Sequence, residues 1–228
     1  MKYTFVLPCL NEEKSLLGVI NEIKNTINEY NLDADILVSD NGSMDKSRDI
    51  ATDNGCNVCL SKEKGYGNAL INGTKNATGD YIFMLDSDGS YSLKNLAFFL
   101  DKSNEGFDFI SGNRFSGGID KGAMPFSHVW GVKALSIYGN LLFNTPIKDW
   151  HCGLRCYKRE KFNDINWLST GMEYASEMII RAKKNDLKMC EVPTVLRKDT
   201  RGAKPHLRTI RDGFRHLILI TKMRIKKI

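Results

Sequence analysis

The segment TGDYIFMLDSDGSY, residues 78–91, decides the fold of this chain. Its centre, Tyr81–Leu85, is the most hydrophobic short run in the sequence, and Gly79 and Asp86 stand at its two ends. A short apolar run between turn residues is typical of a buried strand. We therefore expect a central strand that ends at Asp86, with polar residues following it at the carboxyl end of a sheet.

Strands and helices alternate outward from this segment in both directions. Alternation of this kind predicts an α/β fold, a mostly parallel central sheet flanked by helices, with ligands at the carboxyl ends of the strands. The other expected strands are Lys2–Leu7, Asp35–Ser39, Val58–Leu60, Phe107–Ser111 and Met189–Val192. The expected helices cover Glu12–Tyr30, Ser43–Ile50, Gly67–Ala77, Leu93–Lys102, His128–Asn144 and Met172–Asn185.

The composition is that of an ordinary globular protein. The chain has 228 residues, of which 42% are hydrophobic and 26% charged, which excludes collagen-like, disordered and membrane-embedded classes. We expect one domain over residues 1–205 and a short basic segment over 206–228. The start of the chain lacks the features of a secretory signal, so we expect a cytoplasmic protein whose six cysteines are reduced thiols.

The positive charge of the chain is concentrated near its C-terminus. Residues 197–228 carry eleven Lys and Arg against two acids, a net charge of +9, whereas residues 1–196 carry 22 bases and 25 acids. An apolar stripe at helical spacing accompanies this charge, which predicts a basic amphipathic helix. Binding to an anionic membrane surface fits best, and a helix that closes the core with a solvated basic face is the alternative. Nucleic acid is not favoured, because interleaved aromatics and known binding motifs are missing. The stripe consists of Leu207, Ile210, Phe214, Leu217 and Ile218.

Three loops after expected strands carry candidate chemistry. The carboxylates of Asp86-Ser87-Asp88 suit a hard divalent cation that also holds a diphosphate, although an acidic turn that caps the next helix would look similar. Asp40-Asn41-Gly42-Ser43 either forms a tight turn with a helix cap or presents Asp40 to a nucleobase or ribose. Lys64-Gly65-Tyr66-Gly67-Asn68 precedes a helix, where backbone amides and the lysine could meet phosphate.

Taken together, these motifs resemble family 2 glycosyltransferases, and most closely the dolichyl-phosphate and polyprenyl-phosphate mannosyl- or glucosyltransferases. The similar segments follow one another in the family's order and cover most of residues 3–196. They are VLPCLNEE (6–13), VSDNGS (38–43), KEKGYGNALINGTKNATGDYIFMLDSDGSY (62–91), SGNRF (111–115), DWHCGLRCYKRE (149–160) and GMEYASEMIIRA (171–182).

The resemblance implies a GT-A fold that binds a nucleotide sugar, with Mg²⁺ or Mn²⁺ held by Asp86 and Asp88. Two positions depart from the family's pattern: Ser90 replaces a frequent Gln, and Asn41 replaces an Asp, so a third metal ligand from the protein is not implied. By position, the nucleotide sugar would be bordered by Pro8, Leu10, Glu12, Asp40, Lys64 and Asp86. The basic residues at the acceptor phosphate or donor diphosphate would be Arg114 and Arg155, and the acidic residues of the catalytic half would be Asp149 and Glu177.

The resemblance therefore implies a hexosyltransferase that acts with inversion in cell-envelope glycan biosynthesis. It would move a hexose from a UDP- or GDP-linked sugar to polyprenyl or dolichyl phosphate, as a peripheral protein on the cytoplasmic face of the membrane. An ionised phosphate acceptor needs no strong general base, whereas a hydroxyl acceptor would need one, and Asp149 or Glu177 would supply it. The alternatives are transfer to a hydroxyl of a glycan or other acceptor, and a non-catalytic nucleotide-sugar-binding subunit that assists a membrane-protein partner.

Overall fold

The protein was analysed as a computed structural model that describes residues 1–202 and 209–226. Within these residues, seven strands form one sheet in the order β3-β2-β1-β4-β6-β5-β7. Neighbouring strands are parallel except where β6 pairs with β4 and β5. This arrangement confirms the predicted α/β fold with a mostly parallel sheet. The strands are β1 (Tyr3–Cys9), β2 (Ala34–Asp40), β3 (Asn57–Leu60), β4 (Tyr81–Met84), β5 (Phe109–Asn113), β6 (Arg155–Lys158) and β7 (Met189–Pro193).

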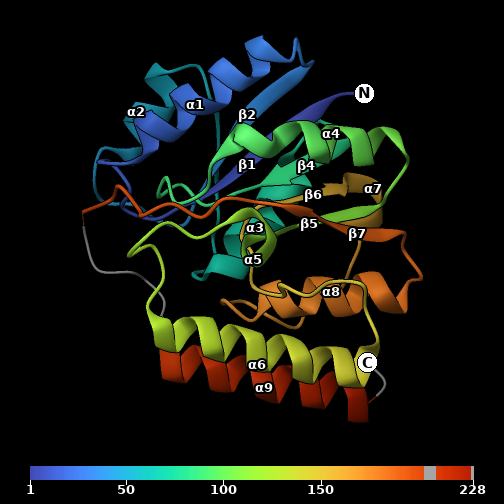
Figure 1. Cartoon of the computed structure of the whole chain (residues 1–228). Helices are drawn as coiled ribbons and strands as arrows, with labels where there is room; N and C mark the ends of the chain where they lie inside the picture. The colour runs from blue at the N-terminus through green and yellow to red at the C-terminus, as the bar shows by residue number, and fades with distance from the viewer. Residues whose placement is uncertain (203–208, 227–228) are drawn as a thin grey trace.

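Helices cover both faces of the sheet, and two long helices form a further layer (Figure 1). One face is covered by α1, α2 and α4, and the other by α3 and α8. Outside α8, α6 and α9 lie side by side. The helices are α1 (Leu16–Glu29), α2 (Ser47–Asp53), α3 (Tyr66–Asn76), the 3-10 helix η1 (Leu93–Asn95), α4 (Leu96–Asn104), α5 (Arg114–Gly117), α6 (Phe126–Phe143), α7 (Arg159–Phe162), α8 (Tyr174–Lys184) and α9 (Thr209–Ile225).

The central strand β4 is buried along its whole length, as the sequence predicted. It pairs with β1 on one side and with β6 on the other. Side chains that alternate along β1 separate the core into two clusters, because Phe5 and Leu7 face α1 whereas Val6 faces α3. The carboxyl ends of β1 and β4 therefore lie side by side, each rigidly held by packing on both faces.

The basic amphipathic helix is present as α9, but its buried face differs from the apolar stripe that the sequence suggested. Phe214, Leu217 and Ile218 are exposed, whereas Ile220 and Met223 are fully buried in the cluster beneath α8. The segment therefore has apolar residues on two faces, and spacing alone could not tell which one packs. The side chains of Leu207 and Ile210 lie outside the described residues, as does the expected boundary at residues 205–206.

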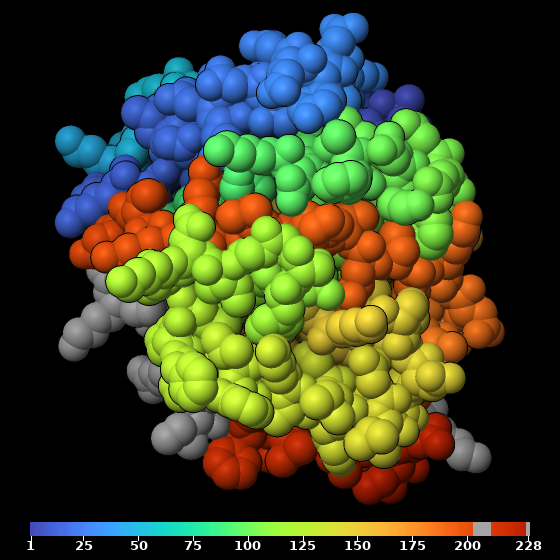
Figure 2. Space-filling model, in the orientation of Figure 1, coloured from blue at the N-terminus to red at the C-terminus, as the bar shows by residue number. Residues whose placement is uncertain are grey.

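The outer sides of α6 and α9 carry two neighbouring stripes of exposed apolar residues, which we call the α6–α9 face. The helices that bear it lie at the edge of the molecule opposite α1 (Figure 2). None of the described helices combines the length and the low charge needed to cross a membrane. The exposed residues are Phe126, Trp130, Ile137 and Leu141 of α6, and Phe214, Leu217, Ile218 and Ile225 of α9.

Candidate active site

The carboxyl ends of β1, β4 and β5 border a cavity of about 650 Å³. Its polar end lies at the loops that follow these strands, and its other end is walled by apolar residues such as Val132 and Leu135 of α6 and Met172 near α8. Gly213 and His216 bring α9 to the same wall. Among the residues implied by the family resemblance, those that line the cavity are Pro8, Leu10, Glu12, Lys64, Asp86, Asp88 and Arg114.

Asp86 and Asp88 both face this cavity, while Ser87 between them turns back and donates to the carbonyl oxygen of Pro8 at 2.7 Å. Asp86 Oδ1 accepts a hydrogen bond from the Tyr66 hydroxyl at 2.8 Å. Burial, followed by the neighbouring charge of Asp88, raises the pKa of the Asp86 carboxyl. Asp88 is buried and Asp86 is partly buried, so two carboxylates with little access to water create a demand for positive charge at this place.

Two carboxylates fit a hard divalent cation, which takes oxygen ligands and retains room for phosphate oxygens and water. Within residues 1–202 and 209–226, no group of three His, Cys, Asp or Glu side chains is placed to hold a metal ion. The protein would therefore supply Asp86 and Asp88, and a bound diphosphate would supply further oxygens.

Arg201, which the sequence analysis did not single out, lies on Asp88. Its guanidinium donates to Oδ2 of Asp88 and approaches Glu12 Oε1 at 3.6 Å. The segment 197–201, which we call the strap, crosses the loop after β4: the Thr200 amide donates to the Asp88 carbonyl at 2.9 Å. The basic tail looked like one surface-binding block in the sequence, and no local pattern separates Arg201 from it.

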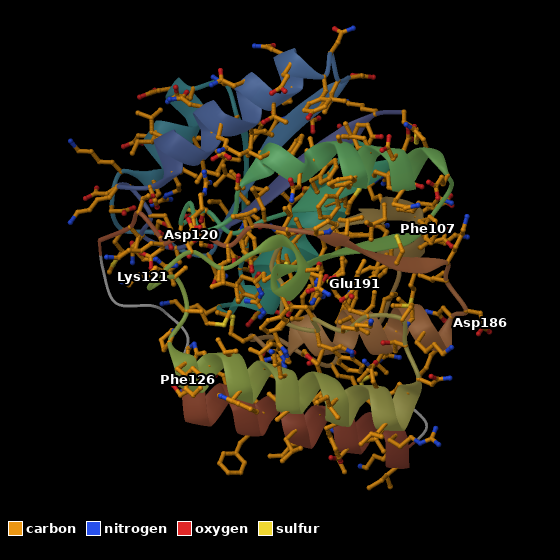
Figure 3. All side chains as sticks on the ribbon, viewed as in Figure 1. Phe107, Asp120, Lys121, Phe126, Asp186 and Glu191 are labelled. Atoms are coloured by element: carbon orange, nitrogen blue, oxygen red, sulfur yellow. The ribbon has the colours of Figure 1, made fainter. Side chains whose placement is uncertain are left out.

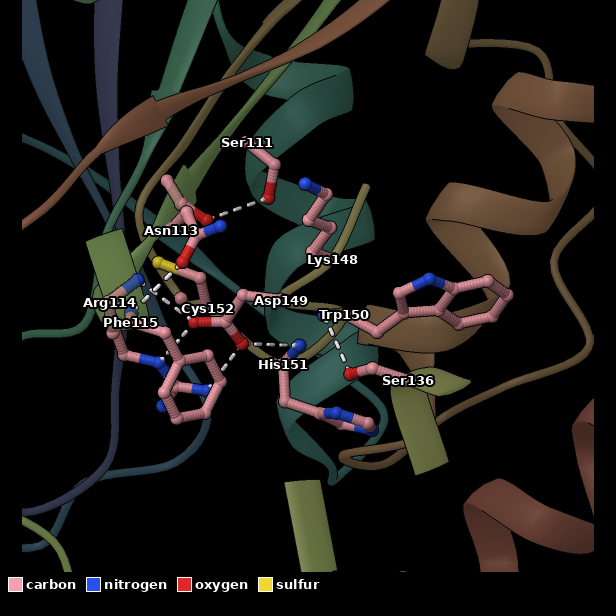
Figure 4. Close-up of polar contacts among 12 residues, drawn as sticks. Ser111, Asn113, Arg114, Phe115, Ser136, Lys148, Asp149, Trp150, His151 and Cys152 are labelled. Atoms are coloured by element: carbon pink, nitrogen blue, oxygen red, sulfur yellow. Dashed lines mark hydrogen bonds and ion pairs between the residues drawn. The ribbon is translucent and has the colours of Figure 1, made fainter. Parts of the chain in front are cut away.

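Arg114 and Asp149 form a bidentate ion pair beside the cavity (Figure 4). Both guanidinium contacts measure 2.8 Å, and the Arg114 amide also donates to Asp149 at 3.0 Å. Asn113 accepts hydrogen bonds from the first amides of α5 and so fixes the turn that presents Arg114. Arg114 lines the cavity, whereas Asp149 is fully buried behind it.

Three other residues implied by the resemblance do not line the cavity, and each holds backbone in place. Arg155 is fully buried and donates to the carbonyls of Trp150, Cys152 and Ala175 at 2.7 to 3.0 Å. This placement favours a positioning role for Arg155. Direct contact of Arg155, Glu177 or Asp40 with substrate stays a prediction. Glu177 accepts from the amides of Leu168 and Ser169, and Asp40 accepts from those of Gly42 and Ser43.

Asn41 lines the cavity where its neighbour Asp40 does not. Its side-chain oxygen accepts from the Gly65 amide at 2.7 Å, and its side-chain nitrogen donates to the Glu63 carbonyl at 2.8 Å. This residue is one of the departures from the family's pattern. The side-chain amide of Asn41 both donates and accepts, and so it ties the loop of Lys64 to the end of β2. An ionised carboxylate only accepts and could not make both bonds.

A buried pair of histidines joins α9 to the loop before β6. His151 Nε2 and His216 Nδ1 lie 3.3 Å apart, and the Ser176 hydroxyl of α8 lies 2.8 Å from His216 Nδ1. Burial lowers the pKa of His216 to about 4, and burial together with the charge of His216 lowers that of His151 well below its usual value. Both rings are therefore neutral in the folded protein near pH 7.

These features are those of a GT-A glycosyltransferase: a mostly parallel sheet, a crevice at its carboxyl edge and a pair of carboxylates directly after the central strand. The pattern of the family described as "Glycosyl transferase family 2" matches residues 4–165, and the chain belongs to this family. The resemblance stated from the motifs is thereby confirmed, and so is the expected fold.

Two relatives come from Haloferax volcanii. The chain is 34% identical to the low-salt glycan biosynthesis hexosyltransferase Agl6 over 93% of its own length and 51% of the relative's, so it spans about half of that protein. It is 29% identical to a dolichyl-phosphate hexose transferase over 86% of both chains.

Solved structures agree on the fold. Glucosyl-3-phosphoglycerate synthase from Mycobacterium tuberculosis, crystallised with Mn²⁺, UDP and glucosyl-3-phosphoglycerate, superposes with a TM-score of 0.74 at 18% identity. The match covers 99% of this chain and 80% of that one. Mannosyl-3-phosphoglycerate synthase from Rubrobacter xylanophilus gives a TM-score of 0.76 at 22% identity, over 100% of this chain and 74% of that one.

Proposed function

We propose that this glycosyltransferase is metal-dependent and transfers a hexose, with inversion, from a UDP- or GDP-linked sugar to polyprenyl or dolichyl phosphate at a membrane surface. The observation that carries the proposal is the two-ended cavity. Carboxylates and cations stand at one end, and apolar side chains such as Val132 and Leu135 of α6 wall the other, where α9 contributes Asp212, Gly213 and His216. A lipid phosphate has the same two-ended chemistry. The dolichyl-phosphate hexose transferase among the relatives supports this acceptor class.

At the polar end, Asp86 and Asp88 would hold Mg²⁺ or Mn²⁺. When bound, the metal would neutralise charge on the departing nucleoside diphosphate. The presence of Mn²⁺ and UDP in a structural neighbour supports this choice of cofactor and donor. The loops that carry Pro8, Leu10 and Glu12, together with Lys64, would enclose the nucleotide, and Asp40 would shape the turn beside it.

Arg114 is placed to bring the acceptor phosphate to the sugar. Its guanidinium is held by Asp149 and faces the cavity, so it can meet an anion without first being ordered. Asp149, one of the two bases considered for a hydroxyl acceptor, has both oxygens on Arg114, and Glu177 is bonded to backbone amides. Both placements favour the phosphate acceptor over the hydroxyl acceptor.

The α6–α9 face would hold the enzyme against the cytoplasmic leaflet. Exposed aromatic and aliphatic residues lie beside the exposed bases Lys133, Arg211, Lys222 and Arg224. The two helices contain a single acidic residue, Asp212, and it is buried. Apolar residues flanked by bases without exposed acids suit an anionic lipid surface.

The test is a transfer assay with the full chain, UDP- and GDP-hexoses, Mn²⁺, and either polyprenyl phosphate or a free hexose as acceptor. We expect transfer to polyprenyl phosphate that disappears on chelation and returns with metal. Asp88→Asn should abolish it, whereas Asp120→Asn, a change in an exposed carboxylate outside the cavity (Figure 3), should not. Transfer to the free hexose alone would establish the hydroxyl acceptor. Donor binding without transfer or hydrolysis would establish the non-catalytic subunit.

A further inference from the structure

Arg201 sits where a cation at Asp88 would sit, and we propose that it is the site's own counter-ion. In this proposal Arg201 yields Asp88 to the divalent metal and then pairs with the donor diphosphate. The inference rests on the proposed function for the metal at Asp88 and for the identity of that diphosphate. It adds to the site a further residue that contacts the donor.

The first support is the charge around the Arg201 side chain, which is 11% exposed. It donates to Asp88, and it lies 3.6 Å from Glu12 and 4.0 Å from Asp199. Asp86 lines the same cavity, so several carboxylates converge there. Buried carboxylates need a nearby cation, and in this state a guanidinium meets that need at Asp88.

The second support is the way the strap is fastened. The Thr200 amide bonds the Asp88 carbonyl at 2.9 Å, and the Arg197 amide bonds the Ser90 carbonyl at 2.7 Å. Gly89 makes the close approach possible: its φ is +76°, and a Cβ at this position would lie 2.7 Å from Thr200 Oγ1. The strap backbone is therefore held by the same turn that carries the metal-binding carboxylate. Arg201 can change partners by side-chain rotation alone.

The third support is that the two cations exclude each other. A guanidinium bonded to Oδ2 of Asp88 and a metal bound at the same carboxylate compete for its oxygens and repel one another. Once displaced, Arg201 still has Glu12 and Asp199 within reach, so it remains at the rim of the cavity. A diphosphate brought by the metal is then the new anion in that space, and arginine binds such oxygens in bidentate fashion.

The test measures two affinities that should change in opposite directions in Arg201→Gln. Mn²⁺ alone, followed by electron paramagnetic resonance of the free ion, should bind about 3- to 10-fold more tightly, because its internal competitor is gone. UDP or GDP at saturating Mn²⁺, followed by calorimetry, should bind about tenfold more weakly or worse. Lys198→Gln is the matched control, since it removes an exposed positive charge from the same strap and should change neither affinity.

Unchanged or weaker Mn²⁺ binding by a folded Arg201→Gln protein would overturn the counter-ion role. Unchanged nucleotide binding at saturating Mn²⁺ would overturn the diphosphate role. Arg201→Lys provides a second variant, which should keep Mn²⁺ affinity near wild type, because a cation remains, and still weaken the nucleotide. Failure of the proposed function is seen separately, in wild-type protein that binds Mn²⁺ and nucleotide but transfers nothing to polyprenyl phosphate.

Discussion

Arg155 is fully buried and bonds backbone instead of lining the cavity. Its guanidinium holds three carbonyls that belong to the loop before β6 and to α8. In Arg155→Lys, a single ammonium on a flexible stem replaces a planar group with five donors, so buried carbonyls lose partners. We expect a loss of about 2–4 kcal/mol in the free energy of unfolding, measured by urea denaturation.

The matched control is Arg159→Lys, because Arg159 is only partly buried and bonds one carbonyl, that of Gly79, at 2.9 Å. That variant should lose no more than about 1 kcal/mol. If Arg155→Lys kept full stability but lost transfer to the acceptor, Arg155 would contact substrate as the resemblance implied, and the positioning role would be wrong.

Gly153 provides a test of the metal site that alters no charge. A Cβ at this position would lie 2.6 Å from Asp86 Oδ2 and 2.9 Å from the Tyr91 ring, both in a packed environment. Gly153→Ala must therefore displace Asp86 or its own loop, and we expect Mn²⁺ affinity to fall about tenfold. Gly18→Ala in α1 meets nothing within 4 Å and should leave Mn²⁺ affinity unchanged. Equal Mn²⁺ affinity of wild type, Gly153→Ala and Gly18→Ala would show that Asp86 is not a metal ligand.

At the residue scale, the sequence predicted the placement of cavity residues that follow a strand end, but not of those that reach the cavity through distant packing. Asp86, Asp88 and Arg114 could be placed because each comes directly after a buried strand, whose carboxyl end must border the crevice. Arg201 could not, because it is 113 positions from Asp88 along the chain and reaches it only through the strap. The resemblance implied a phosphate contact for Arg155, but its burial outside the cavity could not be predicted, since the sequence does not show which way a guanidinium points.

At the scale of elements, the His151–His216 pair makes the attachment of α9 sensitive to pH. His216 has a folded-state pKa of about 4, below the ordinary value of 6.5. As the pH falls from 7 to 5, His216 becomes protonated in the unfolded chain but stays neutral in the folded protein. The free energy of unfolding must therefore fall. His216 alone should account for a loss of about 2 kcal/mol over this range.

The measurement is the free energy of unfolding at pH 7 and pH 5 for wild type and His216→Gln. Between pH 7 and pH 5 the free energy of unfolding of the variant should fall by about 1–2 kcal/mol less than that of wild type. The variant lacks the histidine whose pKa is lowered by folding. The charges of Glu173 and Asp212 oppose the depression, whereas those of Arg155 and Arg215 favour it. Identical pH dependence of the two proteins would show that His216 is not held neutral in the fold.

Elements with one apolar period were predictable, and elements with an ambiguous pattern were not. β4 is uniformly apolar, and α1 has a single buried stripe, so both could be located from the sequence. β6 is four residues long and begins and ends with a basic residue, which masks its strand character. α9 carries apolar residues on two sides, and the buried side is decided by α8, with which it packs.

At the scale of the whole molecule, α6 and α9 carry the α6–α9 face and also contribute residues to the cavity wall, so a lipid surface bound to that face would lie next to the site. We expect the full chain to bind vesicles that contain anionic phospholipid, with an affinity that falls as salt is added. Phe214→Ser and Trp130→Ser should each weaken binding about tenfold, because each removes an exposed aromatic side chain that would enter the interface. Arg224→Gln should weaken it by about 1 kcal/mol, roughly fivefold.

Phe98→Ser is the matched control for this surface, since Phe98 is an exposed aromatic residue of α4, on the other side of the sheet (Figure 1). Its vesicle affinity should equal that of wild type.

Co-sedimentation measures the binding to vesicles, and sedimentation velocity without lipid measures the oligomeric state. Self-association that Phe214→Ser abolishes would assign the face to a second copy of the chain. Loss of salt dependence would remove the basic residues from the contact, because ions at an anionic surface are screened within about 8 Å at physiological ionic strength. Binding that depends on both the aromatic and the basic residues would place the opening of the cavity beside the lipid, where a polyprenyl phosphate can enter with its chain still in the membrane.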